Sequence, residues 1–303
     1  MEASGRGLVG GNALKRRIGA YVLPGDPVWL AESLAQYYPL LDDLVVPVPA
    51  DGLGWSGLPV PVDDCLAAIR SLDTRRIARE FAGHWVNVES PIHADTAQRQ
   101  SGLDQLATSV DWVVQLDNDE FLPRPALLIE AIDRAEELHV DAVELPMRVL
   151  FRRTRKHVFE VTEEGGAPHH EYPGCVIVRP NVRLQNARQV EGPFLRLAAA
   201  RAGASIQLAR PAAEDELRLT NLDEGDAIVH NSWARSPEEI RRKVGSWGHS
   251  GDTNFHRYYW FRWWPVPWIW RLLRNFHPFS KGLWPRLRRL PNAGVIADHP
   301  QAS

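Results

Sequence analysis

Few cysteines and no long apolar runs set the first limits on this chain. Only Cys65 and Cys175 occur among 303 residues, so no disulfide framework is expected and a reducing compartment fits. No apolar stretch reaches the roughly 18 residues of a membrane span. The N-terminus, MEASGRGLVGGNALKRR, lacks the apolar core of a signal peptide, and we expect residues 1–16 to form a flexible tail. These absences predict a cytoplasmic protein.

A strong excess of charge is also absent. The formal net charge is −3, which argues against a general nucleic-acid binder, so no nucleic-acid partner is expected. A composition of 44% hydrophobic and 24% charged residues is that of an ordinary folded protein. With 303 residues, the chain can form one large domain or two small ones around an ample core.

The stretch at residues 111–122, DWVVQLDNDEFL, organises the rest of the chain. It begins as a short apolar run rich in β-branched and aromatic residues, which is typical of a buried strand in a mainly parallel sheet. It ends in Asp117, Asn118, Asp119 and Glu120. Three carboxylates within four residues repel one another unless a cation lies against them, and Mg²⁺ or Mn²⁺ prefers such oxygen ligands. Because ligands of open α/β sheets bind beyond the carboxyl ends of strands, this turn is a candidate metal site. A solvated acidic turn that caps the next helix is the alternative.

Predicted strands and helices alternate around this stretch. Strands are predicted near residues 18–23, 44–48, 75–81, 112–116 and 142–149, with helices between them, and Asp26 and Asp95 are expected at helix N-caps. Such alternation predicts a three-layer, Rossmann-like α/β domain with right-handed crossovers. Later, short strands are expected at 175–178 and 227–230, and Ser236 with Glu239 forms a capping box that starts a helix. We expect one domain over residues 17–250 and an irregular, aromatic-rich extension over 251–303.

A nucleotide-binding α/β half, an apolar strand that ends in LDNDE and a later histidine resemble a family 2 glycosyltransferase of the GT-A fold. The resemblance covers residues 18–247. It implies an inverting enzyme that moves one sugar from a nucleotide-diphosphate sugar with Mn²⁺ or Mg²⁺. The acceptor is left open among a glycan, a lipid-linked sugar and a small molecule. The family's Asp-x-Asp-Glu motif matches residues 117–120, which makes Asp119 the implied metal ligand and Asp117 the implied donor contact. The Gln/Arg-x-x-Arg-Trp motif of processive members is absent.

Three further residues take roles through this resemblance. Asp51 follows the second strand, where related enzymes hold the nucleoside, but their second aspartate is missing and a plain Asp-Gly turn is the alternative. Arg99 lies where related enzymes approach the donor, and a solvated helix charge is its alternative. His230 ends a strand and is a candidate metal ligand, since neutral imidazole binds Mn²⁺; a structural histidine is the other interpretation.

Glu171 is the candidate catalytic base. The segment His169-His170-Glu171-Tyr172 resembles the His-Glu element of some non-processive family 2 enzymes. An inverting transferase needs a carboxylate to accept the proton of the attacking hydroxyl, and a metal-bound carboxylate such as Asp119 is a weak base. A surface loop with incidental polar residues is the alternative.

Two other classes of function compete with sugar transfer. A nucleotidyltransferase uses a similar sheet and acidic site, but a glycine-rich basic loop would favour it, and the loop at residues 23–27 is acidic and bounded by prolines. A non-catalytic protein that binds a sugar or a membrane on the same fold is the second competitor.

The C-terminal part is unusual in both charge and aromatic content. Residues 255–290 contain eight Arg or Lys residues, no Asp or Glu, and twelve Phe, Tyr or Trp residues. Tryptophan and tyrosine prefer the membrane–water boundary, and basic residues favour anionic lipid, so peripheral contact with the inner face of a membrane is one interpretation. The other is that the rings pack as a lid over the sheet on the acceptor side, with the arginines stacked on them.

Overall fold

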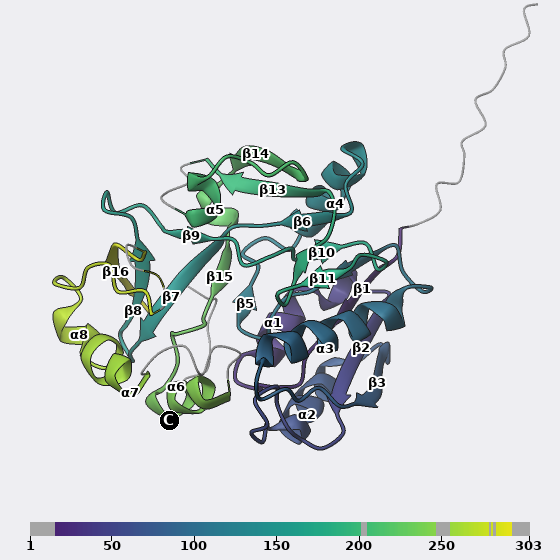
Figure 1. Ribbon diagram of the computed structural model, residues 1–303, viewed down its shortest axis with the longest axis horizontal. Helices are drawn as coiled ribbons and strands as arrows, with labels where there is room; N and C mark the ends of the chain where they lie inside the picture. Colours follow the sequence, from purple (N-terminus) through teal and green to yellow (C-terminus); the bar gives the residue numbers. More distant parts are fainter. Residues whose placement is uncertain (1–15, 201–204, 247–254, 279, 281–282, 293–303) are drawn as a thin grey trace, which may run out of the picture.

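The chain folds around two β-sheets that lie side by side (Figure 1). The computed structural model describes residues 16–200, 205–246, 255–278, 280 and 283–292. The expected tail and the expected boundary at residue 250 fall almost wholly outside these residues. No helix in the described ranges is long and apolar enough to cross a membrane.

The larger sheet has eight strands in the order β14-β13-β6-β10-β4-β1-β2-β3. Every neighbouring pair is parallel except those of β10, which runs antiparallel to both β4 and β6. The prediction of a mainly parallel α/β sheet is therefore confirmed. Its strands are β1 Ile18–Tyr21, β2 Asp43–Pro49, β3 Ala78–Gly83, β4 Trp112–Val114, β6 Ala142–Glu144, β10 Ile177–Val178, β13 Phe194–Ala199 and β14 Glu216–Leu222.

Helices cover both faces of this sheet. Alternate residues of β1 show the two faces, because Ala20 packs with Leu34 in one buried cluster whereas Tyr21 packs with Leu103 in another. The first cluster lies under α1 (Leu30–Tyr37), α2 (Val62–Leu72) and α4 (Leu127–Glu137). The second lies under α3 (Pro91–Leu106) and the hairpin of β11 (Leu184–Gln185) and β12 (Gln189–Val190). The result is the expected three-layer arrangement.

The second sheet has the order β16-β8-β7-β15-β5. Strand β9 pairs with Met147 and Arg148 at the start of β7, before the residues that pair with β8. Its strands are β5 Glu120–Phe121, β7 Met147–Arg153, β8 His157–Thr162, β9 His170–Glu171, β15 Ile228–His230 and β16 Arg286–Pro291. The predicted single strand at 142–149 is wrong, because β6 and β7 belong to different sheets. Pro146 lies between them and has no N–H for a continuous ladder.

The remaining helices are short. They are η1 Tyr38–Leu40, α5 Ile206–Ala209, η2 Glu224–Asp226, α6 Pro237–Ser246, α7 Phe255–Tyr258, the π-helix η3 Tyr259–Trp263 and α8 Val266–Ile269. The capping box at α6 is confirmed, since Ser236 N–H donates to Glu239 and Glu239 N–H donates to the Ser236 hydroxyl, at 2.8 and 3.2 Å. The expected cap at Asp95 is wrong, because α3 already begins at Pro91.

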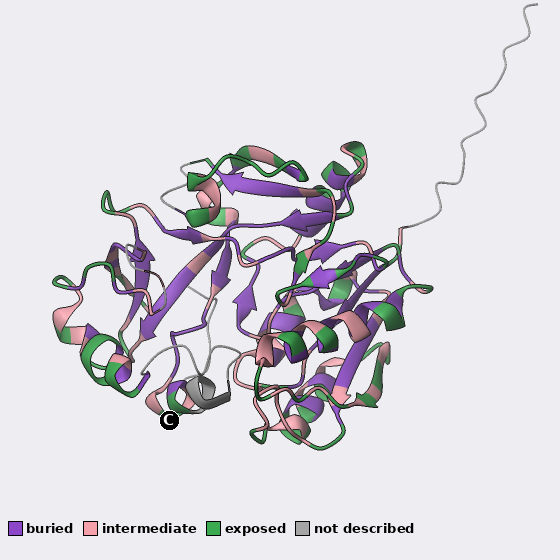
Figure 2. Ribbon diagram, viewed as in Figure 1, coloured by how far each residue is buried: buried purple, intermediate pink, exposed green. Residues whose placement is uncertain are grey.

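The C-terminal segment packs against the second sheet. Buried rings of Tyr259, Trp263, Phe276 and Trp284 join Phe151 of β7 in one apolar cluster. Figure 2 shows that the helices of this segment carry both buried and exposed residues. The Trp263 indole N–H donates to the backbone oxygens of Phe151 and Trp233, at 3.0 and 2.9 Å. These rings form the core that the lid interpretation expects.

Candidate functional site

The acidic turn at residues 117–120 connects the two sheets, because β4 ends before it and β5 begins inside it. The side-chain amide of Asn118 donates to the backbone oxygens of Leu23 and Asp26, at 3.0 and 2.8 Å. Since β1 and β4 are parallel neighbours, the loop after β1 and the turn after β4 meet at the same edge of the sheet. The candidate site lies at the carboxyl ends of strands, where α/β proteins bind ligands.

Each carboxylate of the turn is paired with an arginine from a different part of the chain. The three arginines are only 3–4% exposed. Carboxylates this close together need a cation against them, and the chain itself supplies three. The pairs are Asp117 with Arg99 at 2.8 Å, Asp119 with Arg235 at 2.7 Å, and Glu120 with Arg188 through two hydrogen bonds, one of them 2.7 Å long.

Two further carboxylates share these guanidinium groups. Arg99 also binds Asp95, at 2.6 Å, and Arg235 also binds Asp26. Burial raises the pKa of Asp95, against the opposing charge of Arg99. The pKa of Asp117 is raised by burial but lowered more strongly by Arg99 and Arg188, so it lies below its usual value. With the turn's own acids, five carboxylates lie against three guanidinium groups.

Arg188 reaches the turn through a close backbone approach. It follows the β11 segment, and its backbone oxygen accepts the Cys175 N–H at 3.0 Å. Gly174, with φ of +141°, makes this possible, since a Cβ there would come within 2.9 Å of Arg188 backbone and side-chain atoms. Gly174, which lies three residues after Glu171, therefore helps to place Arg188, the partner of Glu120.

The first cavity lies between the loop after β1, the loop before α2 and helix α3. Its outer part is apolar, with Trp55, Val60 and several prolines. The Trp55 indole donates to Gln98 at 2.7 Å, and Gln98 in turn donates to the Pro47 oxygen at 2.8 Å, which fixes the ring against α3. Its inner part is polar and ends at the acidic turn and Arg235.

The second cavity lies between the acidic turn, the second sheet and the C-terminal segment. Its walls include Glu171, His230, His277 and the rings of Trp233 and Trp284. Aromatic faces beside a carboxylate suit a ligand that carries both apolar C–H groups and hydroxyls.

The two cavities meet at a common wall. Asp95, Arg99, Asp117 and Asp119 line both of them. A ligand in one cavity and a ligand in the other would therefore approach each other at the acidic turn. This geometry suits the transfer of a group from one molecule to another.

The donor set at Asp119 and His230 fits one divalent cation. Asp119 Oδ1 and His230 Nε2 are 3.6 Å apart, and two ligands at about 2.0–2.2 Å from an ion can be separated by this distance. The described residues contain no group of three or more such side chains. Mg²⁺ is often held by one or two carboxylates together with substrate phosphates, and Asp119 supplies one such carboxylate.

Glu171 lies in the second cavity on β9, with its side chain 28% exposed. Its Oε1 accepts the Trp284 indole N–H at 2.6 Å and lies 4.0 Å from His277 Nε2. Burial lowers the pKa of His277, which favours its neutral form. The carboxylate is therefore oriented from one side and open to a ligand on the other.

The structure bears differently on the predictions for Arg99 and Asp51. Arg99 is buried and lines both cavities, so the alternative of a solvated helix charge is wrong. Asp51 is not among the residues that line either cavity. Its carboxylate accepts the Leu53 N–H at 3.0 Å and lies 3.3 Å from His84, as a turn aspartate does. Its contact with a donor stays a prediction.

Sequence reasoning missed four residues of this site: Asp26, Asp95, Arg188 and Arg235. Asp26 and Asp95 were predicted as helix caps and not as residues of the site. A signal existed for Asp95, because Asp95 and Arg99 have the i, i+4 spacing that brings side chains together on a helix. No local signal marks the two arginines.

His170, next to Glu171, gives a prediction about acid stability. It is fully buried, and neither ring nitrogen has a hydrogen-bond partner within the described part of the chain. The pKa of His170 is lowered to about 4, mainly by burial. His169 and Arg148 also lower this pKa, and the carboxylates of Glu160 and Glu163 act in the opposite direction. The unfolded chain binds a proton near pH 6.5, so the free energy of unfolding should fall by about 3 kcal/mol between pH 6.5 and 4 through this residue.

The measurement is urea denaturation of the wild type and His170→Leu between pH 7 and pH 4. The variant should lose less stability than the wild type over this range, whatever their difference at pH 7. Parallel pH profiles of the two proteins would contradict the assignment of a neutral His170.

Comparisons with known proteins leave the function open. No family model and no curated protein matches the sequence. Among solved structures, a 4-diphosphocytidyl-2C-methyl-D-erythritol synthase from Anaerococcus prevotii is 11% identical, with 55% of this chain and 72% of that chain covered and a TM-score of 0.34. A mannose-6-phosphate isomerase from Helicobacter pylori is 10% identical, with 54% and 71% covered and a TM-score of 0.34. A CMP:2-keto-3-deoxy-manno-octonic acid synthetase complexed with CTP is 11% identical, with 55% and 75% covered and a TM-score of 0.32. Similarity this low carries no argument, and the functional proposal depends on the site itself.

Proposed function

We propose that this chain is an inverting, nucleotide-sugar-dependent glycosyltransferase similar to family 2 enzymes. The observation that carries the proposal is the pair of cavities with a common wall of acids and Arg99. A transferase must hold a donor and an acceptor on opposite sides of the bond that breaks. The common wall provides one place where both can meet.

The first cavity is the proposed donor site. Its apolar outer part, with the fixed Trp55 ring, suits the planar base of a nucleotide. Its inner part suits a diphosphate, because Arg99 and Arg235 lie there. Arg99 Nη1 is buried without a hydrogen-bond partner among the described residues, and it could donate a hydrogen bond to a phosphate oxygen. Asp117 would face the ribose or the sugar, and Asp51 would contact the nucleoside at the rim.

The second cavity is the proposed acceptor site. Glu171 would accept the proton of an acceptor hydroxyl while the hydroxyl oxygen forms its bond to the sugar's anomeric carbon. The bond from that carbon to the diphosphate oxygen breaks at the same time, and the electron pair leaves with the diphosphate. Attack from the face opposite the leaving group inverts the configuration.

Asp119 and His230 would hold Mn²⁺ or Mg²⁺ at the common wall. Such an ion supplies positive charge to the diphosphate leaving group. The excess of carboxylates over guanidinium groups, five against three, supports a divalent cation here. Arg99 and Arg235 orient the acids and would contact the phosphates directly.

The test is a panel of nucleotide-diphosphate sugars with Mn²⁺ and candidate acceptors, with release of nucleoside diphosphate as the readout. We expect release with at least one donor. A second panel supplies nucleoside triphosphates and sugar phosphates. Release of inorganic diphosphate in that panel alone would identify a nucleotidyltransferase and contradict the proposal. Binding without turnover in both panels would identify a non-catalytic binding protein.

A further inference from the structure

Some rings of the C-terminal segment point away from the core. Five large apolar residues of this segment are exposed: Trp260 at 46%, Phe261 at 68%, Trp264 at 37%, Trp268 at 73% and Leu272 at 79%. They make up half of the large apolar side chains that are exposed on the described residues. The other half, Leu58, Val86, Val88, Ile206 and Leu217, includes no aromatic residue and lies on other elements. The concentration within residues 260–272 therefore needs an explanation of its own.

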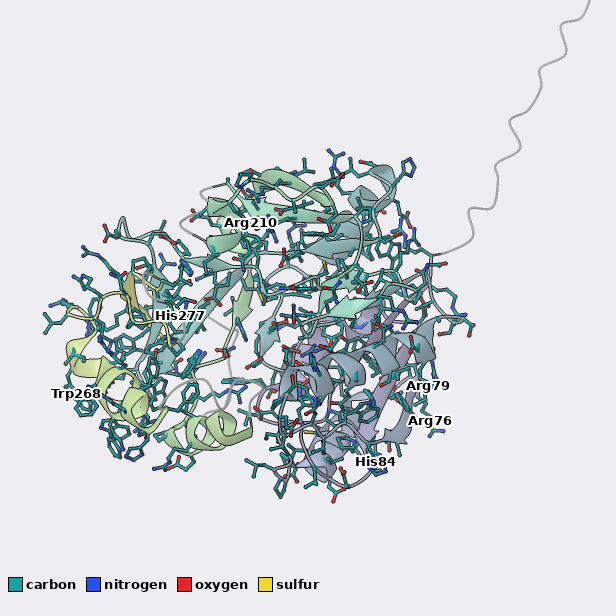
Figure 3. All side chains as sticks on the ribbon, in the orientation of Figure 1. Arg76, Arg79, His84, Arg210, Trp268 and His277 are labelled. Carbon is teal, nitrogen blue, oxygen red and sulfur yellow. The ribbon has the colours of Figure 1, made fainter. Side chains whose placement is uncertain are left out.

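Four of the five exposed side chains recur at one spacing along consecutive short helical turns, and Phe261 follows the first of them in the sequence. Residues 260, 264, 268 and 272 follow each other at a spacing of four, which places them on the same side of consecutive helical turns. The rings of Trp260 and Trp264 lie 6.0 Å apart. On the opposite side, Tyr259 and Trp263 are buried against the second sheet. We call the exposed group, Trp260, Phe261, Trp264, Trp268 and Leu272, the outer face. Figure 3 shows Trp268 at the edge of the molecule and His277 farther inward.

Exposed arginines are interspersed with the outer face along the sequence. Arg257, Arg262, Arg271 and Arg274 are all exposed. Residues 255–292 contain eight basic residues and none of the chain's 38 acids, although the whole chain has a net charge of −3. The charge of this segment is therefore opposite in sign to that of the rest of the protein.

We propose that the outer face is a docking surface for an anionic lipid bilayer. Tryptophan rings are stable at the boundary between headgroups and acyl chains, and each arginine near an anionic leaflet adds on the order of 1 kcal/mol. Two copies that meet through their outer faces fit poorly, because the same arginines would then face each other with no acid of this segment between them. The short helical turns would lie in the interface, and the second sheet would stay outside it.

The experiment is co-sedimentation of the full-length protein with vesicles. Vesicles of phosphatidylcholine with phosphatidylglycerol are compared with vesicles of phosphatidylcholine alone. We expect binding to the anionic vesicles at low salt, and at least a tenfold weaker partition at about 0.5 M salt, where the Debye length falls to a few ångströms. No binding to anionic vesicles at low salt would overturn the proposal.

Two variants separate the contributions of rings and charge. Trp260→Ser, Phe261→Ser and Trp268→Ser together should lower the partition at least tenfold, and Arg257→Gln, Arg262→Gln, Arg271→Gln and Arg274→Gln together should remove the preference for anionic lipid. Val86→Ser, Val88→Ser and Leu217→Ser form the matched control, because they replace exposed apolar residues elsewhere, and binding should persist. A thermal melt of each variant verifies the fold.

Two results would contradict the assignment. Wild-type partition of the triple ring variant would place the lipid contact elsewhere. A dimer in solution that becomes monomeric in the ring variant, without vesicle binding by the wild type, would make the outer face a contact between copies. Vesicle binding needs no turnover, so the result is independent of the proposed reaction.

Discussion

Replacing Asp119 by asparagine should lower kcat by at least about 10³-fold, down to the background of the assay, while the protein remains folded. The substitution keeps the shape and one side-chain oxygen but removes the negative charge beside His230, where the cation is proposed. Arg235 keeps its ion pair with Asp26, so the guanidinium is not left without a carboxylate. We therefore expect only about 1–3 kcal/mol of lost stability, far less than complete unfolding.

The matched control is Asp226→Asn. It also removes a carboxylate that lies 2.7 Å from an arginine, Arg124, but it is outside both cavities and should keep turnover near the wild-type level. Nucleoside diphosphate should raise the melting temperature of the wild type in the presence of Mn²⁺ or Mg²⁺, and this gain should disappear in Asp119→Asn. An equal gain for the wild type in a chelator would refute the metal assignment.

Replacing Glu171 by glutamine should lower kcat by roughly 10²- to 10⁴-fold with little change in donor affinity. Glutamine keeps an oxygen that can accept the Trp284 indole N–H, so the side chain should keep its orientation. What it loses is the ability to take a proton. Glu171 lines the second cavity and is not among the residues of the first, which explains why donor binding should be spared.

Glu163→Gln provides the comparison for this prediction. Glu163 precedes the same strand and lies 2.6 Å from His169, but it lines neither cavity. Its variant should keep kcat near the wild-type level. Full activity after Glu171→Gln would mean that another group takes the proton.

The acidic turn was predictable because its signal is local. An apolar run that breaks into DNDE at the end of a buried strand needs no tertiary information. The arginines that neutralise it were not predictable, because Arg235 is 116 residues from Asp119 and Arg188 is 68 residues from Glu120. Hydrophobic periodicity reports which side of an element is buried, but not which distant charge lies against it.

The division into two sheets was also hidden. Residues 142–149, AVELPMRV, are mostly apolar, and both halves are buried, so the burial pattern cannot distinguish one strand from two. Pro146 was the available sign of a break. In the C-terminal segment, composition alone could not separate core rings from surface rings. The sequence does contain two separate spacings of four, one from Trp260 to Leu272 for the exposed residues and one from Tyr259 to Trp263 for the buried rings.

The C-terminal segment joins the second sheet and the second cavity at once. Strand β16 pairs with β8 over six residues, and Trp284 binds Glu171. A shortened protein that ends near residue 254 would expose Phe151 and release Glu171. A loss of membrane binding in such a protein could therefore result from misfolding and would not test the outer face. The segment cannot be lost or exchanged as a separable module. A related protein that acts at another location would therefore have to differ by single substitutions at exposed positions of this segment. Its buried rings would have to stay unchanged.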